Sequence, residues 1–372
     1  MHKLQRIMPF IHQHKHWPNF TWQLEEFVAE LAEVRNLQGR ILGRMESLGF
    51  DLRSEANLET LTLEVLKSTE IEGELLNPGQ VRSSIARKLG LEIAGSVESD
   101  RDVDGVVEMM IDATQNCYKP VTAERLFSWH SSLFPSGRSG LYKITVGKWR
   151  TDSTGPMQVV SGPLGKEKVH FQAPDSSVIN KEMKQFLKWF NEKTEMDLVL
   201  KAAVAHLWFV TIHPFDDGNG RITRALSDML LARSDKSSQR FYSMSAQIRL
   251  ERKLYYENLE KAQRGNLDIT QWIKWFLNCL VRALNSTDNT LNRVLWKADF
   301  WSIHSKTDLN DRQRKILNKL LEGFQGNLTS SKWSRMAKCS KDTSIRDIND
   351  LIKKGILKKL KSGGRSTGYV LK

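Results

Sequence analysis

The sequence predicts a mainly α-helical protein with one β-hairpin in its middle and a winged helix-turn-helix at its C-terminal end. Apolar residues recur at intervals of three and four along most of the 372 residues, which is the spacing of an α-helix with one buried face. Strand-like runs beside glycine-containing loops occur at only two places. With 40% hydrophobic and 27% charged residues, the chain has the composition of a folded globular protein, so a disordered chain is excluded.

The first 100 residues are expected to form an N-terminal helical region. Gly49 ends its first helix, and Asn77-Pro78-Gly79 is expected to stop its second, because Pro-Gly breaks helices. The polar segment 95–102 marks the boundary to the next domain. The predicted helices cover residues 22–48, 58–76 and 81–91.

Residues 101–306 form the predicted middle domain, which is helical except for one hairpin. Residues 157–161 and 169–172 are strand-like runs joined by the Gly/Lys-rich loop 162–168, and Pro174 ends the hairpin. The helical pattern covers residues 103–117, 123–134, 178–193, 198–212, 221–233, 250–264 and 268–284.

Residues 307–372 are predicted to form the winged helix-turn-helix and carry most of the charge. The net charge is +13, and 16 basic against 6 acidic residues lie between 308 and 372. A basic module on a nearly neutral body favours contact with DNA, and a solvated face that docks a protein is the alternative. The predicted elements are helices over 310–322, 331–337 and 342–354 and strands over 356–360 and 369–371, with 362–366 between the strands.

The cysteines and the hydropathy of the chain indicate which cellular compartment and which metal sites to expect. Three cysteines without a C-x-x-C pair argue against a disulfide framework and a cysteine zinc site. No run approaches the roughly 18 apolar residues of a membrane span, and the start lacks a signal-peptide pattern. A cytoplasmic protein with no membrane partner is therefore expected. His12, His14 and His16 alternate, but a metal site there needs further ligands to close.

The segment from His213 to Arg224 is the candidate catalytic loop. It lies between two helical patterns, at a helix N-terminus, where unpaired N–H groups and the positive dipole end attract an anion. Gly218 and Gly220 let the backbone approach that anion closely. Arg221 and Arg224 lie three apart on one face of the first turn. The segment therefore predicts a phosphate cradle with two guanidinium clamps.

Two further residues of this loop suit phosphate chemistry. Asp217 is placed to hold Mg²⁺ against the phosphates, and His213 is the group suited to accept a proton near pH 7. Spacing excludes better-known loops: no Lys-Ser/Thr follows Gly220, as a Walker A loop requires, and Thr223 stands where a Rossmann loop needs glycine. An EF-hand alignment puts Phe215 where an acid is required. His206 lacks the spacing of a metalloprotease helix and is interpreted as a packed core residue.

The loop resembles the H-x-F-x-[D/E]-G-N-G-R-x-x-R signature of the Fic family at every defined position. Eight fixed positions within twelve make a chance match very rare. Most members are protein adenylyltransferases, which transfer AMP from ATP to a hydroxyl group of a target protein. The resemblance therefore implies ATP as the substrate, Mg²⁺ as the cofactor and a protein as the partner. The matching residues are His213, Phe215, Asp217, Gly218, Asn219, Gly220, Arg221 and Arg224.

The resemblance also implies a role for each matching residue. His213 would be the general base on the target hydroxyl, Asp217 would hold Mg²⁺, and Phe215 would be a core anchor. Arg221 and Arg224 would contact the β- and γ-phosphates. The remaining matching residues, Gly218, Asn219 and Gly220, would cradle the α- and β-phosphates.

Two regions outside the loop extend the resemblance. The hairpin resembles the family's flap, which aligns the target segment by strand addition. Tyr255, Tyr256 and Gln263 match positions that border the adenosine, although the family often has Asn where Gln263 stands. The two tyrosines could instead be core aromatics. The residues expected to cover the nucleotide are Val169, His170 and Phe171.

An inhibitory motif of the family, [S/T]-x-x-x-E-[G/N], is matched by Ser68, Glu72 and Gly73. On a helix, Ser68 and Glu72 are four apart and share a face. The resemblance implies that Glu72 pairs with Arg224 and keeps the γ-phosphate from its productive place. The alternative is that Glu72 is a solvated helix acid.

The function expected from these observations is AMP transfer from ATP to a Ser, Thr or Tyr hydroxyl of a target protein and of the protein itself, restrained by Glu72. One alternative is a relative that transfers UMP, a phosphate or phosphocholine, or that removes AMP with Glu72 directing water. The non-enzyme alternative is a DNA-binding regulator whose middle domain senses nucleotide. A second copy of the chain is left open as a partner.

Overall fold

The computed structural model describes residues 10–93, 95–153, 155–162, 166, 168–321, 324, 326–360 and 367–372, without the side chains of 289 and 290. It divides into two compact units, one made of residues 1–92 and 96–288 and the other of residues 289–372 with 93–95. Within the described ranges, no helix combines the length and the apolar character that crossing a membrane requires.

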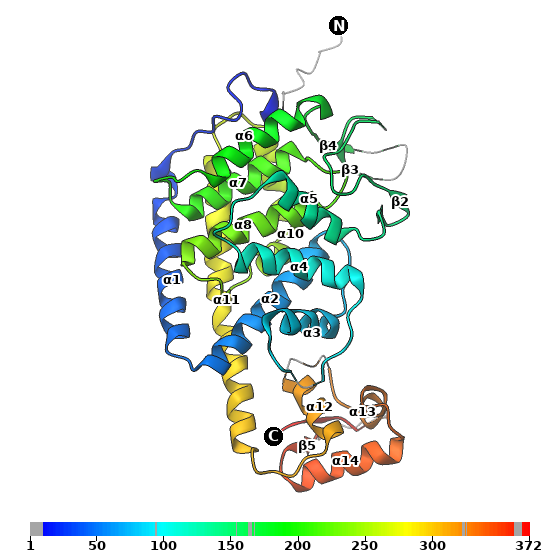
Figure 1. Ribbon diagram of the computed structural model, residues 1–372. Coiled ribbons are helices and arrows are strands. Elements are labelled where there is room, and N and C mark those ends of the chain that lie inside the picture. The colour runs from blue at the N-terminus through cyan, green and yellow to red at the C-terminus, as the bar shows by residue number, and fades with distance from the viewer. Residues whose placement is uncertain are drawn as a thin grey trace. The chain divides into compact units, whose positions relative to one another are not determined.

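The fold is mainly α-helical, as the sequence predicts (Figure 1). Short 3-10 helices cover Ile11–Gln13, Leu24–Glu26 and Ser176–Val178. The α-helices from the N-terminus to the end of the first unit are α1 (Val28–Glu46), α2 (Phe50–Ile71), α3 (Pro78–Leu89), α4 (Arg101–Gln115), α5 (Ala123–Leu133), α6 (Ile179–Asn191), α7 (Leu198–Ile212), α8 (Asn219–Asp235), α9 (Met244–Leu250), α10 (Arg252–Gln263) and α11 (Thr270–Ile303), which continues into the second unit.

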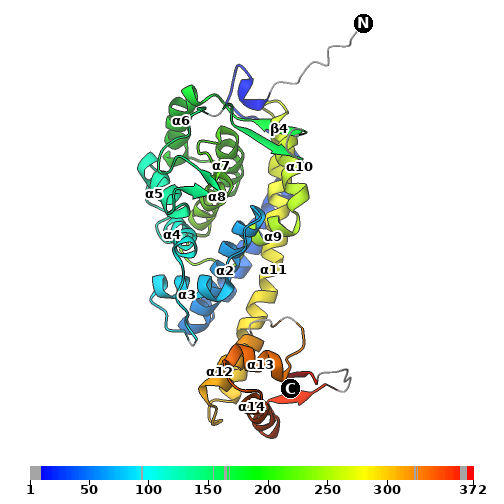
Figure 2. The ribbon, with the colours of Figure 1, turned by 90° about the vertical axis from the view of Figure 1, so that its right-hand side faces the viewer.

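Helix α7 is the central helix of the first unit. Its residues from Val199 to Ile212 are all buried, because its sequence is apolar on every side rather than along one stripe. Helix α8 packs along it, α6 and α10 also contact α7, and α4 and α5 contact α8 (Figures 1 and 2). The loop between α7 and α8 is therefore held by the best-packed pair of helices in the unit.

The second predicted helix has different ends from those expected. Helix α2 runs from Phe50 to Ile71, and Asn77-Pro78-Gly79 begins α3 instead of stopping α2. The Asn77 side chain accepts hydrogen bonds from the N–H groups of Gly79 and Gln80, and Pro78 lies in the first turn, where its missing N–H costs nothing. The Asn-Pro-Gly segment, which was expected to end a helix, therefore starts one.

Other boundaries also differ from prediction. The first helix begins at Val28 after a 3-10 turn, and the helix predicted over 250–264 is divided at Glu251 into α9 and α10. Helix α11 extends well beyond residue 284, since Leu291 and Val294 continue its buried stripe. A two-residue hairpin, β1 (Arg138–Ser139) with β2 (Tyr142–Lys143), was not predicted, because strands of two residues leave no alternation to detect.

The predicted flap hairpin is present. Strand β3 (Gln158–Ser161) pairs antiparallel with β4 (Lys168–Gln172), and the register shifts between Val159 and Val160. Most of the expected connecting loop, residues 163–165 and 167, lies outside the described residues.

The second unit has its own apolar core. In chain order it contains α12 (Asp311–Leu321), α13 (Ser330–Ala337), α14 (Lys341–Lys353), β5 (Leu357–Lys359) and β6 (Tyr369–Leu371). Trp333 of α13 is fully buried among apolar side chains of α12 and α14, and β5 pairs antiparallel with β6. The predicted turn 362–366 lies outside the described residues.

Candidate active site

The candidate catalytic loop is shaped by two left-handed residues. His213, at the end of α7, has φ 51°, and Gly218, at the start of α8, has φ 79°. A Cβ at Gly218 would lie 2.9 Å from the Phe134 ring, so only glycine fits there. Histidine in this conformation is uncommon and costs free energy, which is typical of a functional position.

Asn219 and Phe215 hold the loop in shape. The Asn219 side chain accepts a hydrogen bond from the Phe215 N–H at 3.0 Å and donates to the Phe215 carbonyl oxygen at 2.8 Å. The Phe215 ring is fully buried and stacks on the His130 ring, with centroids 4.2 Å apart. The Asn219 hydrogen bonds and the buried Phe215 ring thus fix the loop. The first N–H groups of α8 have no partner within the helix and can bind a ligand.

His213 is oriented as a base. Its Nδ1 lies 3.2 Å from the Val210 carbonyl oxygen, which can only accept, so Nδ1 carries the proton and Nε2 is free to accept one. Burial lowers the pKa of His213, which keeps the imidazole neutral at pH 7.

Arg150, which sequence reasoning missed, supports the same residue from its backbone. Its side chain is buried, and it donates from Nε to the His213 carbonyl oxygen at 2.8 Å and from Nη2 to the Pro174 carbonyl oxygen at 2.5 Å. It also pairs with Asp152. No local sequence signal marks Arg150, because its partners come from distant segments.

Both carboxylate oxygens of Asp217 accept hydrogen bonds. Oδ1 accepts a hydrogen bond from the Gly218 N–H at 2.6 Å, and Oδ2 accepts one from the Ser139 hydroxyl. Within the described residues no group of three or more His, Cys, Asp or Glu side chains could form a metal cage. A single carboxylate fits Mg²⁺, which keeps waters and shares phosphate oxygens, so Asp217 suits the ion and Ser139 would have to yield to it.

The two loop arginines are both held by acids from the segment after α2. Arg224 is buried and donates from Nη2 to Glu72 Oε1 at 2.7 Å, and a Cβ at Gly220 would lie 2.1 Å from that carboxylate oxygen. Arg221 donates from Nη1 to Glu74 Oε2 at 2.9 Å. The structure therefore brings Glu72 to Arg224, and it adds Glu74, which sequence reasoning missed although it lies only two residues farther on.

Ser68 also contacts Arg224. Its hydroxyl accepts from Arg224 Nε at 2.9 Å, and its carbonyl oxygen accepts from Nη2 at 2.7 Å. Gly73 has φ 93°, a conformation that favours glycine, and it turns the chain at the end of α2. Two residues of the inhibitory motif, Ser68 and Glu72, thus contact Arg224, whereas Gly73 shapes the turn that follows them.

The flap strand β4 is fastened to α10 and its C-terminal end. Arg264 donates to the carbonyl oxygens of Val169 at 2.8 Å and His170 at 3.0 Å, and His170 Nδ1 lies 2.7 Å from Glu260. The Phe171 ring is buried, with the Phe10 ring edge-on at 5.2 Å. Strand β4 is therefore held in place by contacts with Glu260, Arg264 and Phe10.

The three predicted adenosine residues differ in exposure. Tyr255 is buried, with its hydroxyl 2.9 Å from His206 Nε2, and Gln263 is buried and donates to the Thr211 hydroxyl at 3.3 Å. Tyr256 is 37% exposed. Burial and the neighbouring Glu72 carboxylate raise the pKa of Tyr256, which places it beside the inhibitory segment.

Among the described residues, the remaining histidines belong to no group of three or more His, Cys, Asp or Glu side chains. His206 is buried, as interpreted from its spacing, and burial lowers its pKa to about 3. His12 stacks on Phe10, and burial lowers its pKa to about 4. His14 contacts the Gly265 carbonyl oxygen at 3.1 Å, and His16 is exposed.

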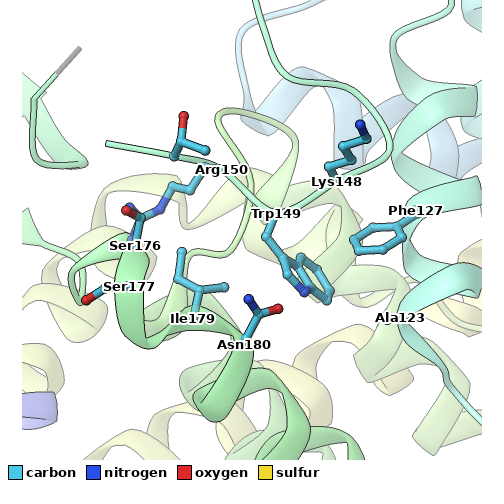
Figure 3. A pocket seen from close by; sticks show the side chains of 10 residues that line it. Ala123, Phe127, Lys148, Trp149, Arg150, Ser176, Ser177, Ile179 and Asn180 are labelled. Carbon is cyan, nitrogen blue, oxygen red and sulfur yellow. The ribbon is translucent and has the colours of Figure 1, made fainter. Parts of the chain in front are cut away.

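A pocket of about 460 Å³ is lined by Arg150, which holds the catalytic loop, but by no residue of the loop itself. Figure 3 shows the Trp149 indole and the Phe127 ring side by side at this pocket, with Ser176 and Ser177 at the opposite side. Of the residues that hold the catalytic loop, Arg150 is the one that also lines it. None of the predicted site residues does.

Two segments of the chain match known protein families. Residues 120–231 match the Fic/DOC family, and residues 10–91 match a domain of unknown function, DUF4172. The protein adenylyltransferase fic-1 of Caenorhabditis elegans is 26% identical over 211 residues, which are 56% of this chain and 38% of that protein. The protein adenylyltransferase Fic of Culex quinquefasciatus is 26% identical over 246 residues, 65% of this chain and 43% of that protein. The chain thus spans less than half the length of these relatives.

Two solved structures share the fold. A Fic family protein from Desulfovibrio desulfuricans G20 has a TM-score of 0.52 at 20% identity and covers 93% of this chain and 95% of its own. A Fic domain-containing signalling protein from Bacteroides thetaiotaomicron VPI-5482 has a TM-score of 0.52 at 19% identity and covers 70% of this chain and 97% of its own. At these identities the likeness concerns the fold alone.

Proposed function

Since residues 120–231 are a Fic/DOC domain, as the sequence resemblance implied, we propose that the protein is a protein adenylyltransferase that transfers AMP from ATP to a hydroxyl group of a target protein and of itself. The observation that carries this proposal is the neutral His213, which lies before a helix N-terminus that presents two arginines. A base next to an anion site is the minimum that hydroxyl attack on a phosphate requires.

In the proposed reaction, His213 Nε2 takes the proton of a Ser, Thr or Tyr hydroxyl. The hydroxyl oxygen attacks the α-phosphorus of ATP in line, the bond from the α-phosphorus to the bridging oxygen breaks, and pyrophosphate leaves. Arg221, Arg224 and the N–H groups at the start of α8 hold the phosphates. A bound Mg²⁺, held by Asp217, would neutralise phosphate charge.

Labelled ATP tests the proposal. The protein is incubated with Mg²⁺ and ATP labelled on the α-phosphate, and in parallel with ATP labelled on the γ-phosphate and with UTP, GTP and CTP labelled on the α-phosphate. Transfer of the α-label from ATP supports AMP transfer. His213→Ala should lose the transfer while binding ATP, because the phosphate cradle does not use the imidazole. Transfer of the γ-label, or of another nucleotide in preference, would select the alternative transferase.

We propose that Glu72 restrains this activity. Its carboxylate lies on Arg224, so the guanidinium is not available to a γ-phosphate while the pair is formed. The division of the chain at residues 100 and 306 is likewise a proposal, with the N-terminal region supplying the restraint.

We propose DNA as a second partner, bound by the second unit. Helix α14 has two acids that face α12, where Arg312 donates to Asp347 at 2.8 Å and Gln313 donates to Asp350 at 2.8 Å. Lys341, Arg346 and Lys353 of α14 are exposed, and so are Lys358 and Lys359 of β5. Exposed lysine and arginine side chains of this kind are suited to contact DNA phosphates.

Fluorescence anisotropy with a labelled random-sequence duplex tests this second candidate. Binding by the full chain should weaken steeply with salt, because phosphate contacts release counterions. Arg346→Gln should lower the logarithmic salt slope by about 1, whereas Lys319→Gln, an exposed lysine of α12, should leave the slope unchanged. Salt-independent binding, or no binding, would favour protein docking on this face.

A further inference from the structure

The segment that follows α2 presents two acids to the catalytic loop. Glu72 ends the helix, Gly73 has φ 93°, the Gly73 N–H donates to the Glu70 carbonyl oxygen at 3.1 Å, and the Glu74 N–H donates to the Thr69 carbonyl oxygen at 3.3 Å. This is the Schellman arrangement of a helix C-terminus. It places two carboxylates on either side of one left-handed glycine.

These two acids meet two arginines of the first turn of α8. Glu72 contacts Arg224, and Glu74 contacts Arg221. The side chain of Arg221 is only 3% exposed, and its guanidinium carbon lies 5.0 Å from the centre of the Phe134 ring. The two arginines are three residues apart in α8, and the two acids are two residues apart around Gly73. Each arginine therefore pairs with a different carboxylate.

Each guanidinium also has a donor to spare. Among the described residues, Nε of Arg221 and Nη1 of Arg224 are buried without a hydrogen-bond partner. Buried donors are nearly always paired, and leaving one unpaired costs about 1–3 kcal/mol. Two such donors on neighbouring arginines point to an anion with more oxygens than the two carboxylates supply.

We propose, on the basis of the proposed function, that Glu74 is a second anion gate, which competes with the phosphates of the nucleotide for Arg221. A nucleotide with a phosphate chain must then displace two carboxylates rather than one. The Glu74 side chain is 49% exposed and that of Glu72 is 29% exposed, so the Arg221 pair is the better solvated and the easier to open. Glu74 thus sets how readily the phosphate chain enters.

Calorimetric binding to the full chain tests the gate, with ATP as the probe and adenosine as the probe without phosphate. Glu74→Gln should bind ATP roughly fivefold more tightly than the parent, which is the upper value for losing a partly exposed ion pair. Adenosine should bind all variants equally. Glu74→Asp, which keeps the charge but withdraws it from Arg221, should shift the ATP affinity in the same direction.

Glu70→Gln is the matched control. Glu70 lies in the last turn of α2 and pairs with Lys67 and Arg249, so its substitution removes the same charge without touching Arg221 or Arg224. It should leave ATP affinity within twofold of the parent. The double variant Glu72→Gln, Glu74→Gln should bind ATP more tightly than either single variant.

The outcomes separate the gate from the proposed function. Unchanged ATP affinity in Glu74→Gln, an equal gain in Glu70→Gln, or an equal gain for adenosine would each overturn the gate. If ATP binds more tightly as expected but no variant transfers AMP, the gate stands and the proposed function fails. If AMP transfer is found but the affinity is unchanged, the function stands and the gate fails.

Discussion

Arg224 and Glu72 form an ion pair at the candidate site. The Arg224 side chain is 2% exposed, and its Nη2 donates to Glu72 Oε1 and to the Ser68 carbonyl oxygen, each at 2.7 Å. Burial, the largest single effect, lowers the pKa of Arg224, but the Glu72 carboxylate together with Tyr255 and Tyr256 raises this pKa overall. The guanidinium is therefore charged and already satisfied on one edge by this chain's own acid.

Glu72→Gln should label itself with AMP faster than the parent at equal ATP and Mg²⁺. The amide has no charge with which to hold Arg224, and misplacement of a reacting group can cost on the order of a hundredfold in rate. Incorporation of α-labelled AMP into the protein measures the effect. Glu72→Gly is a second test, although it also loosens the end of α2 by about 1 kcal/mol. An unchanged or slower rate in both variants would remove the restraining role.

The rate of AMP transfer should depend on pH through His213. Burial lowers the pKa of this group, and a base acts only when neutral, so kcat/KM should rise with an inflection below the ordinary value of about 6.5 and be flat above pH 7. The profile is best measured in Glu72→Gln over pH 5 to 9. If kcat/KM still rises above pH 7, another group is the base.

Arg150→Met should destabilise the first unit and slow AMP transfer. The buried guanidinium bonds two backbone carbonyl oxygens and Asp152, and its loss leaves all three without this donor, at a cost of about 3 kcal/mol in the free energy of unfolding. Urea unfolding and kcat measure the two effects. Arg150→Lys keeps the charge but not the planar fork, so it should fall between parent and Arg150→Met. A normal kcat in Arg150→Met would show that His213 needs no such support.

Two buried histidines should make the protein sensitive to acid. Burial lowers the pKa of His130 to about 4 and that of His206 to about 3, whereas in the unfolded chain each titrates near 6.5. Below pH 6.5 the unfolded state binds protons that the folded state does not, so stability falls as pH falls. Each group should remove about 2 kcal/mol between pH 7 and pH 5.

Urea unfolding of the parent at the two pH values measures this loss. His206→Gln removes one of the two titrations, so its free energy of unfolding should change less between pH 7 and pH 5 than that of the parent. An equal change in parent and variant would contradict the assignment.

Much of the candidate site could be predicted because it is contiguous. Residues 213–224 form one loop and the first turn of one helix, so their spacing in sequence is also their spacing in space. The same holds for Ser68 and Glu72 on α2. Most helices were predicted for a similar reason, and α7 was predicted with both ends as observed, since each rests on local apolar spacing.

The errors fall where local and tertiary signals differ. Asn77-Pro78-Gly79 could equally stop one helix or begin the next, and the side chain of Asn77 settled the matter as an N-cap. Helix α11 runs past its predicted end, and Leu291 and Val294 in this extension are buried.

The sequence by itself predicted the fold class, the resemblance to the Fic family and the loop's interpretation as a phosphate cradle, because these depend on residue types at fixed local spacings. Only the tertiary structure decided which distant groups act on that loop. Glu74 and Arg221 are 147 positions apart, and Arg150 and His213 are 63 apart. No local spacing encodes such pairs, since they exist only when apolar burial packs α2, α8 and the segment before the flap around α7.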